Sequence, residues 1–190
     1  PLVGLGSVDS APWAVFLRLS GVGRAWSLGR VGIDHMTGAS SIQRSVVAVP
    51  ARLASSRLPD KVLADIGGQP MVQRVLKRCS QSEGLSAVVL CTDSERLQDL
   101  ALSWGYPVLM TSEACSSGSE RIASVADQLV ALAWGEQVDH WDVHQRQERL
   151  QCTAVINVQG DQPFLDPAVV TQMVAEFGRR VPVPAVVTPV

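Results

Sequence analysis

The sequence predicts an α/β fold in which a parallel sheet is covered by helices. Two observations lead to this prediction: short apolar runs alternate with amphipathic helical patterns, and the runs contain no polar alternation. Uninterrupted apolar runs are typical of strands buried on both faces of a parallel sheet. Strands that alternate with helices indicate right-handed βαβ units. The 190 residues, 46% of them apolar and 18% charged, suffice for one domain with a buried core.

Five apolar runs are the predicted strands of this sheet. They span residues 45–49, 87–91, 107–110, 153–158 and 184–190. The fifth run reaches the last residue of the chain, so we expect the fold to be truncated at its C-terminus.

Four amphipathic patterns lie between these runs and predict helices. Proline is favoured in the first turn of a helix, and Pro70 begins the first pattern. Ser94 is a suitable N-cap for the second pattern, which ends at Gly105. A third helix is expected over residues 120–133, and a fourth begins after Asp166.

Two segments do not fit this alternation. Residues 134–150 are polar, and we interpret them as an insertion or hairpin extension at the surface. Within them, His140 and His144 have the spacing of metal ligands only if the segment is helical, and no third ligand is near. Residues 1–35 carry no periodic apolar face, so we expect a poorly packed extension outside the domain, with Met36 as the natural start.

Composition argues against several classes of protein. The net charge of −2 shows no basic excess, so no nucleic-acid partner is expected. Residues 13–33 are the most apolar stretch near the start, but three arginines interrupt them, so no membrane span is predicted. The cysteines are far apart and suggest neither a zinc site nor a disulfide framework, which favours a reducing cytoplasm. They are Cys79, Cys91, Cys115 and Cys152.

A parallel sheet binds its ligands at the carboxyl ends of its strands, and the loop after the first strand is rich in cations. Residues 50–61 contain Arg52, Arg57 and Lys61, with Ser55 among them. Arginine forks match phosphate oxygens and lysine adds a point charge, so this loop suits a polyphosphate. It lacks the glycine spacing of a Walker loop. The alternative interpretation is an ordinary solvated surface loop.

Four motifs, taken in order along the chain, resemble the motifs of a known family. They are Pro50-Ala51-Arg52 with Ser55, Arg57-Leu58-Pro59 and Lys61; Thr92-Asp93; Ser117-Gly118-Ser119-Glu120-Arg121; and Asn157-Val158-Gln159-Gly160-Asp161-Gln162-Pro163. Together they resemble the sugar nucleotidyltransferases that make CMP-activated acidic sugars. The resemblance is greatest to the family of 3-deoxy-manno-octulosonate (KDO) cytidylyltransferases, also called CMP-KDO synthetases, and it covers residues 45–190.

This resemblance implies a fold and a reaction. The fold would be a three-layer, Rossmann-like parallel or mixed sheet of the nucleotide-diphospho-sugar transferase type. Residues 36–190 would be its N-terminal, nucleotide-binding part, with the second half missing. The enzyme would transfer CMP from CTP to KDO with Mg²⁺, release pyrophosphate and serve lipopolysaccharide biosynthesis, and the full-length protein would be a homodimer. Two alternatives stay open: another acidic-sugar nucleotidyltransferase on the same fold, or an inactive nucleotide-binding fragment.

The resemblance also implies a role for individual residues. Catalysis would depend on Arg52, Arg57 and Lys61, which hold the triphosphate, and on Asp161, which binds the metal. The sugar would contact Arg121, through its carboxylate, and Gln159. The residues implied to bind the nucleotide are Pro50, Ala51, Arg52, Ser55, Arg57, Lys61, Thr92, Asp93, Ser117 and Gly118.

Several of these residues have simpler interpretations. Asp161 suits a turn after a strand, Asp93 suits the start of a helix, and Arg121 suits an ion pair with a neighbour. The chain departs from the family pattern at Asp60, where the family usually has glycine, at Cys115-Ser116, at Gln162, and in the longer segment 134–150. An acid beside Lys61 is expected to weaken triphosphate binding, although aspartate tolerates turn conformations.

Overall fold

The main sheet of the protein has five strands, and all neighbouring strands are parallel. The computed structural model describes residues 16–18, 26–29, 42–54, 58–179 and 186–189. In these residues the strand order is β1-β6-β3-β4-β5. The strands are β1 (Phe16–Arg18), β3 (Arg44–Ala51), β4 (Ala87–Thr92), β5 (Val108–Met110) and β6 (Thr153–Asn157). A separate antiparallel pair joins β2 (Trp26–Gly29) to β7 (Val186–Pro189).

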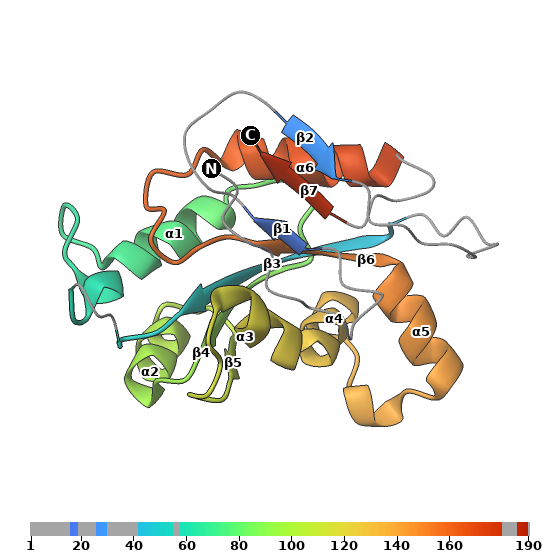
Figure 1. Ribbon diagram of the computed structural model, residues 1–190, viewed down its shortest axis with the longest axis horizontal. Coiled ribbons are helices and arrows are strands. Elements are labelled where there is room, and N and C mark those ends of the chain that lie inside the picture. The colour runs from blue at the N-terminus through green and yellow to red at the C-terminus, as the bar shows by residue number, and fades with distance from the viewer. Residues whose placement is uncertain (1–15, 19–25, 30–41, 55–57, 180–185, 190) are drawn as a thin grey trace.

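Helices cover both faces of the sheet, so the predicted three-layer α/β fold is confirmed (Figure 1). The helices on one face are α1 (Met71–Cys79), α2 (Glu95–Ser103) and α6 (Pro167–Arg179). Those on the other are α3 (Gly118–Ser124), α4 (Ala126–Trp134) and α5 (Val143–Gln151). Short 3-10 turns are η1 (Lys61–Leu63) and η2 (Val138–His140). Figure 1 shows α1 and α6 above the sheet, and α3, α4 and α5 below it.

The central strand β3 explains the uninterrupted apolar run. Val47 and Val49 face the core beneath α1, α2 and α6, whereas Val46 and Ala48 face the core beneath α3, α4 and α5. All four side chains are fully buried. A strand with a core on each side needs apolar residues at every position, which is the pattern in the sequence.

The predicted helix over residues 120–133 is two helices in the structure. Val125 has φ −123° and ψ 22°, which ends α3 and begins α4. This residue is β-branched and therefore a poor helix former, and its side chain is buried in the same core as Ile122 and Leu129. The break lets Val125 pack into the core, which outweighs the lost helical continuity.

The polar residues 134–150 are largely helical, which the sequence analysis did not predict. A capping box at Asp142 begins α5, but Leu150 is the buried residue of this helix, so no apolar stripe marks it in the sequence. The Trp134 ring anchors the segment, because the guanidinium groups of Arg44 and Arg149 lie 5.3 Å and 4.1 Å from its centroid.

His140 and His144 are both exposed on this segment. No group of three histidine, cysteine, aspartate or glutamate side chains that could hold a metal occurs in the described part of the chain. The cysteines are buried and free, and burial raises the pKa of the Cys79 and Cys91 thiols to about 12. These thiols therefore stay protonated near neutral pH.

Two short strands fall inside the expected extension, residues 1–35. The backbone of β1 pairs with β6, and that of β2 pairs with β7. A free edge of β6 offers unpaired backbone groups, which a further strand can satisfy. The other residues of the extension lie outside the described part, and where the domain begins stays a prediction. Among the described residues, no helix has the length and apolar character needed to cross a membrane.

Candidate functional site

The carboxyl ends of the parallel strands meet at one edge of the sheet, and most of the predicted site residues lie at those ends or follow them. Pro50 and Ala51 end β3, Thr92 ends β4, and residues 158–163 follow β6. Arg52 comes directly after β3 and is exposed. Ser55 and Arg57 lie outside the described residues, so their predicted contacts with phosphate stay predictions.

Two glycines bring separate loops against the end of β3. A Cβ atom on Gly118 would lie 2.9 Å from Cγ of Pro50, and one on Gly160 would lie 3.0 Å from the carbonyl oxygen of Pro50. The Gly160 position is also 3.2 Å from Cβ of Ala51. Contacts this short leave no room for a side chain, so glycine is required for the approach. The start of α3 and the loop after β6 are therefore packed directly on the end of β3.

Lys61 and Asp161 form an ion pair at this edge. Nζ of Lys61 lies 2.8 Å from Oδ2 of Asp161, although the two residues are 100 positions apart in the sequence. Their side chains are 42% and 44% exposed. The structure thus brings together two residues that the sequence analysis assigned to catalysis, and it leaves both accessible to a ligand.

Asp60 pairs with Arg96 of α2, although the sequence analysis expected its charge to act on the adjacent Lys61. Its φ of 55° lies in the left-handed region, which explains why glycine suits this position. Its carboxylate accepts a hydrogen bond from Arg96, whose Nη1 lies 3.2 Å from Oδ2. The charge of Asp60 is therefore balanced by the first turn of α2.

Arg121 and Asp93 form a second ion pair, which is buried. Nη2 of Arg121 lies 2.6 Å from Oδ2 of Asp93, and the side chains are 3% and 13% exposed. Nη1 of Arg121 donates to the hydroxyl of Thr111. Of the two roles considered for Arg121, an ion pair with a neighbour is the one seen in this structure. The pair joins the ends of β4 and β5 to α3, and so stiffens one wall of the site.

The turn before α3 is held by its own hydrogen bonds. The Ser117 hydroxyl accepts from the backbone N–H of Glu120 at 3.1 Å, which caps the helix. The Glu120 carboxylate accepts from Ser116 through the hydroxyl and the backbone N–H, at 2.5 Å and 2.7 Å. These hydrogen bonds from Ser116 lower the pKa of Glu120 below its ordinary value. A turn fixed in this way presents Ser117 and Gly118 to a ligand without further ordering.

Asn157 is a site residue that the sequence analysis quoted only as part of a motif. It is fully buried at the end of β6 and accepts a hydrogen bond from Nε2 of Gln159 at 2.9 Å. Its own Nδ2 lies 3.5 Å from the Ser119 hydroxyl. The signal in the sequence was a polar amide that ends a wholly apolar strand, since buried polar groups need partners. Asn157 holds the predicted sugar-binding Gln159 in place.

The donor chemistry of Asp161 is compatible with magnesium. Mg²⁺ keeps several waters and binds through one or two carboxylates together with substrate phosphates. Asp161 supplies one partly exposed carboxylate, and the ammonium of Lys61 shows that a positive charge is favourable beside it. Asp161 is the one carboxylate assigned to a metal among the described residues. A site with a single protein carboxylate suits an ion that arrives together with a nucleotide, and not a permanently bound metal.

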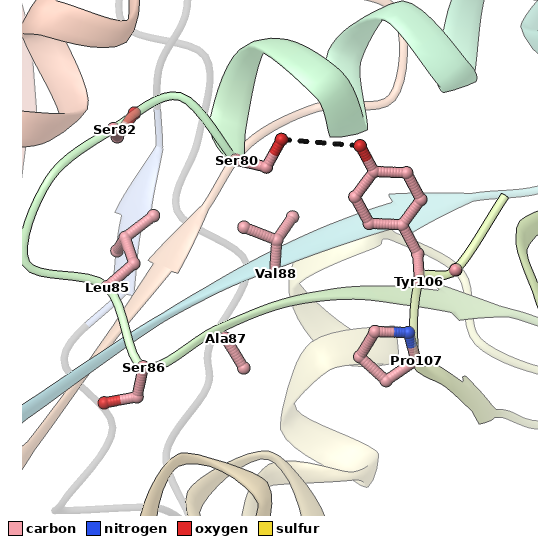
Figure 2. Close-up of a pocket in the computed structure, with 9 residues that line it drawn as sticks. Ser80, Ser82, Leu85, Ser86, Ala87, Val88, Tyr106 and Pro107 are labelled. Atoms are coloured by element: carbon pink, nitrogen blue, oxygen red, sulfur yellow. Dashed lines mark hydrogen bonds between the residues drawn. The ribbon is translucent and has the colours of Figure 1, made fainter.

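A hollow elsewhere on the surface is separate from this edge. Figure 2 shows it beside the start of β4 and the residue before β5, which is the opposite edge of the sheet. The Ser80 and Tyr106 hydroxyls face each other there at 3.4 Å. The hollow contains none of the predicted site residues. Its lining is Ser80, Ser82, Leu85, Ser86, Ala87, Val88, Gly105, Tyr106 and Pro107.

Comparison with known sequences supports the resemblance seen in the motifs. Residues 46–181 match the sequence model of a family described as cytidylyltransferase. A 3-deoxy-manno-octulosonate cytidylyltransferase of Idiomarina loihiensis is 38% identical over 76% of this chain and 50% of its own length. That of Haemophilus influenzae is 42% identical over 67% of this chain and 42% of its own. An 8-amino-3,8-dideoxy-manno-octulosonate cytidylyltransferase of Shewanella amazonensis is 40% identical over 70% and 46%.

Solved structures give the same picture. A CMP:2-keto-3-deoxy-manno-octonic acid synthetase complexed with CTP superposes with a TM-score of 0.56 and 30% identity, over 70% of this chain and 47% of the other. A cytidylyltransferase from Leptospira borgpetersenii, at 21% identity and a TM-score of 0.51, shares the fold. The chain spans about half or less of the length of the relatives it matches.

Proposed function

Since the chain belongs to the cytidylyltransferase family, we propose that it binds CTP and takes part in transferring CMP to KDO, with release of pyrophosphate. The observation that supports this proposal best is the meeting of Lys61 and Asp161 at the carboxyl edge of the sheet. A cation for the phosphates and a carboxylate for a metal are the two groups that nucleotidyl transfer requires side by side.

The triphosphate is proposed to lie along the loop after β3. Lys61 and Arg52 are the described cations of that loop, and Arg57 and Ser55 are expected to complete it. These cations hold the phosphates and balance the charge that grows on the departing pyrophosphate. Mg²⁺, when bound beside Asp161, would polarise the α-phosphate toward the attacking hydroxyl.

The nucleoside and the sugar are proposed to lie between the same loops. Gly118, tight against Pro50, and the hydrogen-bonded Ser117 form one side of the nucleotide site. The buried pair of Asp93 and Arg121 backs this side. Because both charges of that pair are engaged, its role is to keep the wall rigid.

Gln159 is the proposed contact for the sugar. Its amide N–H donates to Asn157, which leaves the amide oxygen for a hydroxyl or amino group of the substrate. A polar group held in this way discriminates well once a ligand covers it, because a ligand without the matching group leaves it unpaired. The Asn157 contact fixes which way the Gln159 amide faces.

A second candidate sugar is 8-amino-3,8-dideoxy-manno-octulosonate. Relatives named for that sugar are as similar to this chain as those named for KDO, at 38–42% identity. The two sugars differ in one hydroxyl or amino group, and the motifs of this chain bind phosphate and metal. The choice between the sugars is therefore a matter for experiment.

The experiment measures binding of CTP, UTP, ATP and GTP by calorimetry, and pyrophosphate release with each sugar. We expect CTP to bind in preference to the other nucleotides, and pyrophosphate release to require Mg²⁺ and KDO. Release with the 8-amino sugar alone would support the second candidate. CTP binding without release would support the inactive nucleotide-binding fragment. Absence of CTP binding would overturn the proposal.

The setting of the reaction is proposed on the same grounds. A cytidylyltransferase for KDO would serve lipopolysaccharide biosynthesis in the cytoplasm, where free cysteines stay reduced. The full-length protein is proposed to be a homodimer. Sedimentation of the full-length protein would test the dimer directly, since a monomer at high concentration would exclude it.

A further inference from the structure

We infer that Lys61 is an internal counter-ion for Asp161, so that a divalent cation and a phosphate each displace the same ion pair and thereby favour each other's binding. Lys61 donates to Asp161 at 2.8 Å in the ligand-free structure. A cation bound at Asp161 would release Lys61 for phosphate, and a phosphate bound at Lys61 would release Asp161 for the cation. The inference rests on the proposed function, because it assigns these two ligands to this pair.

The exposure of the pair makes it displaceable. Both side chains are more than two fifths exposed, and an ion pair of that kind is worth little in water. The neighbouring pair of Arg121 and Asp93 is different, since its side chains are 3% and 13% exposed. Breaking a buried ion pair leaves a buried charge with neither a counter-ion nor water, so a ligand does not readily displace such a pair. Lys61 and Asp161 therefore form an ion pair at this edge that is suited to exchange partners.

The binding of cation and phosphate is coupled because both ligands require the same ion pair to be broken. The first ligand to bind must break the ion pair, whereas the second finds its partner already free. By linkage, the cation strengthens phosphate binding by the same factor as phosphate strengthens cation binding. This coupling adds to the direct contact between a metal ion and a bound phosphate, and it is carried by the chain's own residues.

The decisive variants are Lys61→Gln and Asp161→Asn, which remove one charge each and keep the size of the side chain. We expect Lys61→Gln to bind Mn²⁺ alone about two- to fivefold more tightly than the parent, which is what an exposed ion pair is worth. Water proton relaxation reports this binding without nucleotide. We expect Asp161→Asn to bind pyrophosphate in EDTA more tightly by a similar factor, measured by calorimetry.

Two matched controls exclude a general effect of charge. Lys77→Gln, in the last turn of α1, and Asp139→Asn, on η2, each remove the same charge far from this edge, at positions with exposed side chains. Both controls are expected to bind Mn²⁺ and pyrophosphate as the parent does. If a variant unfolds, Lys61→Met provides a second removal of the ammonium.

The outcomes separate the inference from the proposed function. Unchanged or weaker Mn²⁺ binding in Lys61→Gln, including no detectable binding in any variant, would overturn the inference. A gain shared equally by Lys77→Gln would overturn it too. These measurements use no nucleotide, whereas the proposed function is tested by CTP binding and pyrophosphate release. CTP binding with unaltered Mn²⁺ affinity in Lys61→Gln would leave the function intact and refute the counter-ion.

Discussion

Removing the charge of Asp93 is expected to destabilise the protein strongly, because it leaves the buried guanidinium of Arg121 without its counter-ion. Asp93→Asn keeps the shape of the side chain and takes away the negative charge beside Arg121, whose side chain is only 3% exposed. Loss of one partner from a buried ion pair typically costs about 3–5 kcal/mol. For a chain of this size each kcal/mol lowers the melting temperature by about 2–4 °C, so a fall of about 6–20 °C is expected.

The matched control removes the same charge from an exposed ion pair. Asp60→Asn breaks the contact with Arg96, where the side chains are 63% exposed for the arginine and 49% for the aspartate. Asparagine tolerates the left-handed backbone of position 60 as well as aspartate does, so the substitution tests the charge alone. A change below about 1 kcal/mol, or less than about 4 °C, is expected.

Both variants are compared by thermal unfolding and by guanidinium denaturation at neutral pH. We expect the unfolding midpoint of Asp93→Asn to fall well below that of Asp60→Asn, with similar denaturant slopes in both. Two small and equal shifts would refute it. They would mean that Arg121 is satisfied without Asp93, and that the wall formed by β4, β5 and α3 does not depend on the buried pair.

Two further predictions concern a close contact and a carboxylate. Gly160→Ala places a methyl group 3.0 Å from the carbonyl oxygen of Pro50 and is expected to cost about 1–3 kcal/mol and weaken CTP binding, as calorimetry can measure. Gly135→Ala, which has a strained φ of 67° but open space, is expected to lower stability and leave CTP binding unchanged. Hydrogen bonding by Arg149 lowers the pKa of Glu136, so this carboxylate stabilises the fold above the ordinary glutamate pKa of about 4.3 and stops doing so as pH falls through its lowered pKa. Glu136→Gln is therefore expected to flatten the acid limb of stability, and an unaltered pH profile would contradict this.

The strands could be predicted because a strand with a hydrophobic core on each side is apolar at every position. Residues 46–49 are apolar at every position, and each faces one of the two helical layers. The N-cap at Ser94 was equally readable, since its hydroxyl accepts from the backbone of Leu97 three residues on. Signals of this kind are local, and they depend on the chemistry of a few adjacent residues.

Other features depended on partners that the local sequence does not reveal. Arg121 was assigned a choice between a sugar and a neighbour, and only the fold shows Asp93 within reach. α5 was missed because Leu150 is its one buried residue, and its anchor is the Trp134 ring on another helix. The break at Val125 was missed because its apolar spacing continues unbroken across it. Tertiary contacts outweigh propensity in each of these cases.

The pairing of β3 with β6 has a consequence for how the protein is made. Lys61 and Asp161, on loops that follow these strands, are 100 residues apart. At synthesis rates of about 5–20 residues per second, the ribosome needs roughly 5–20 s to deliver the second after the first. During that time one edge of the central strand β3 is without its partner strand. A lower growth temperature, or a chaperone that covers nascent strands, should therefore raise the yield of soluble protein.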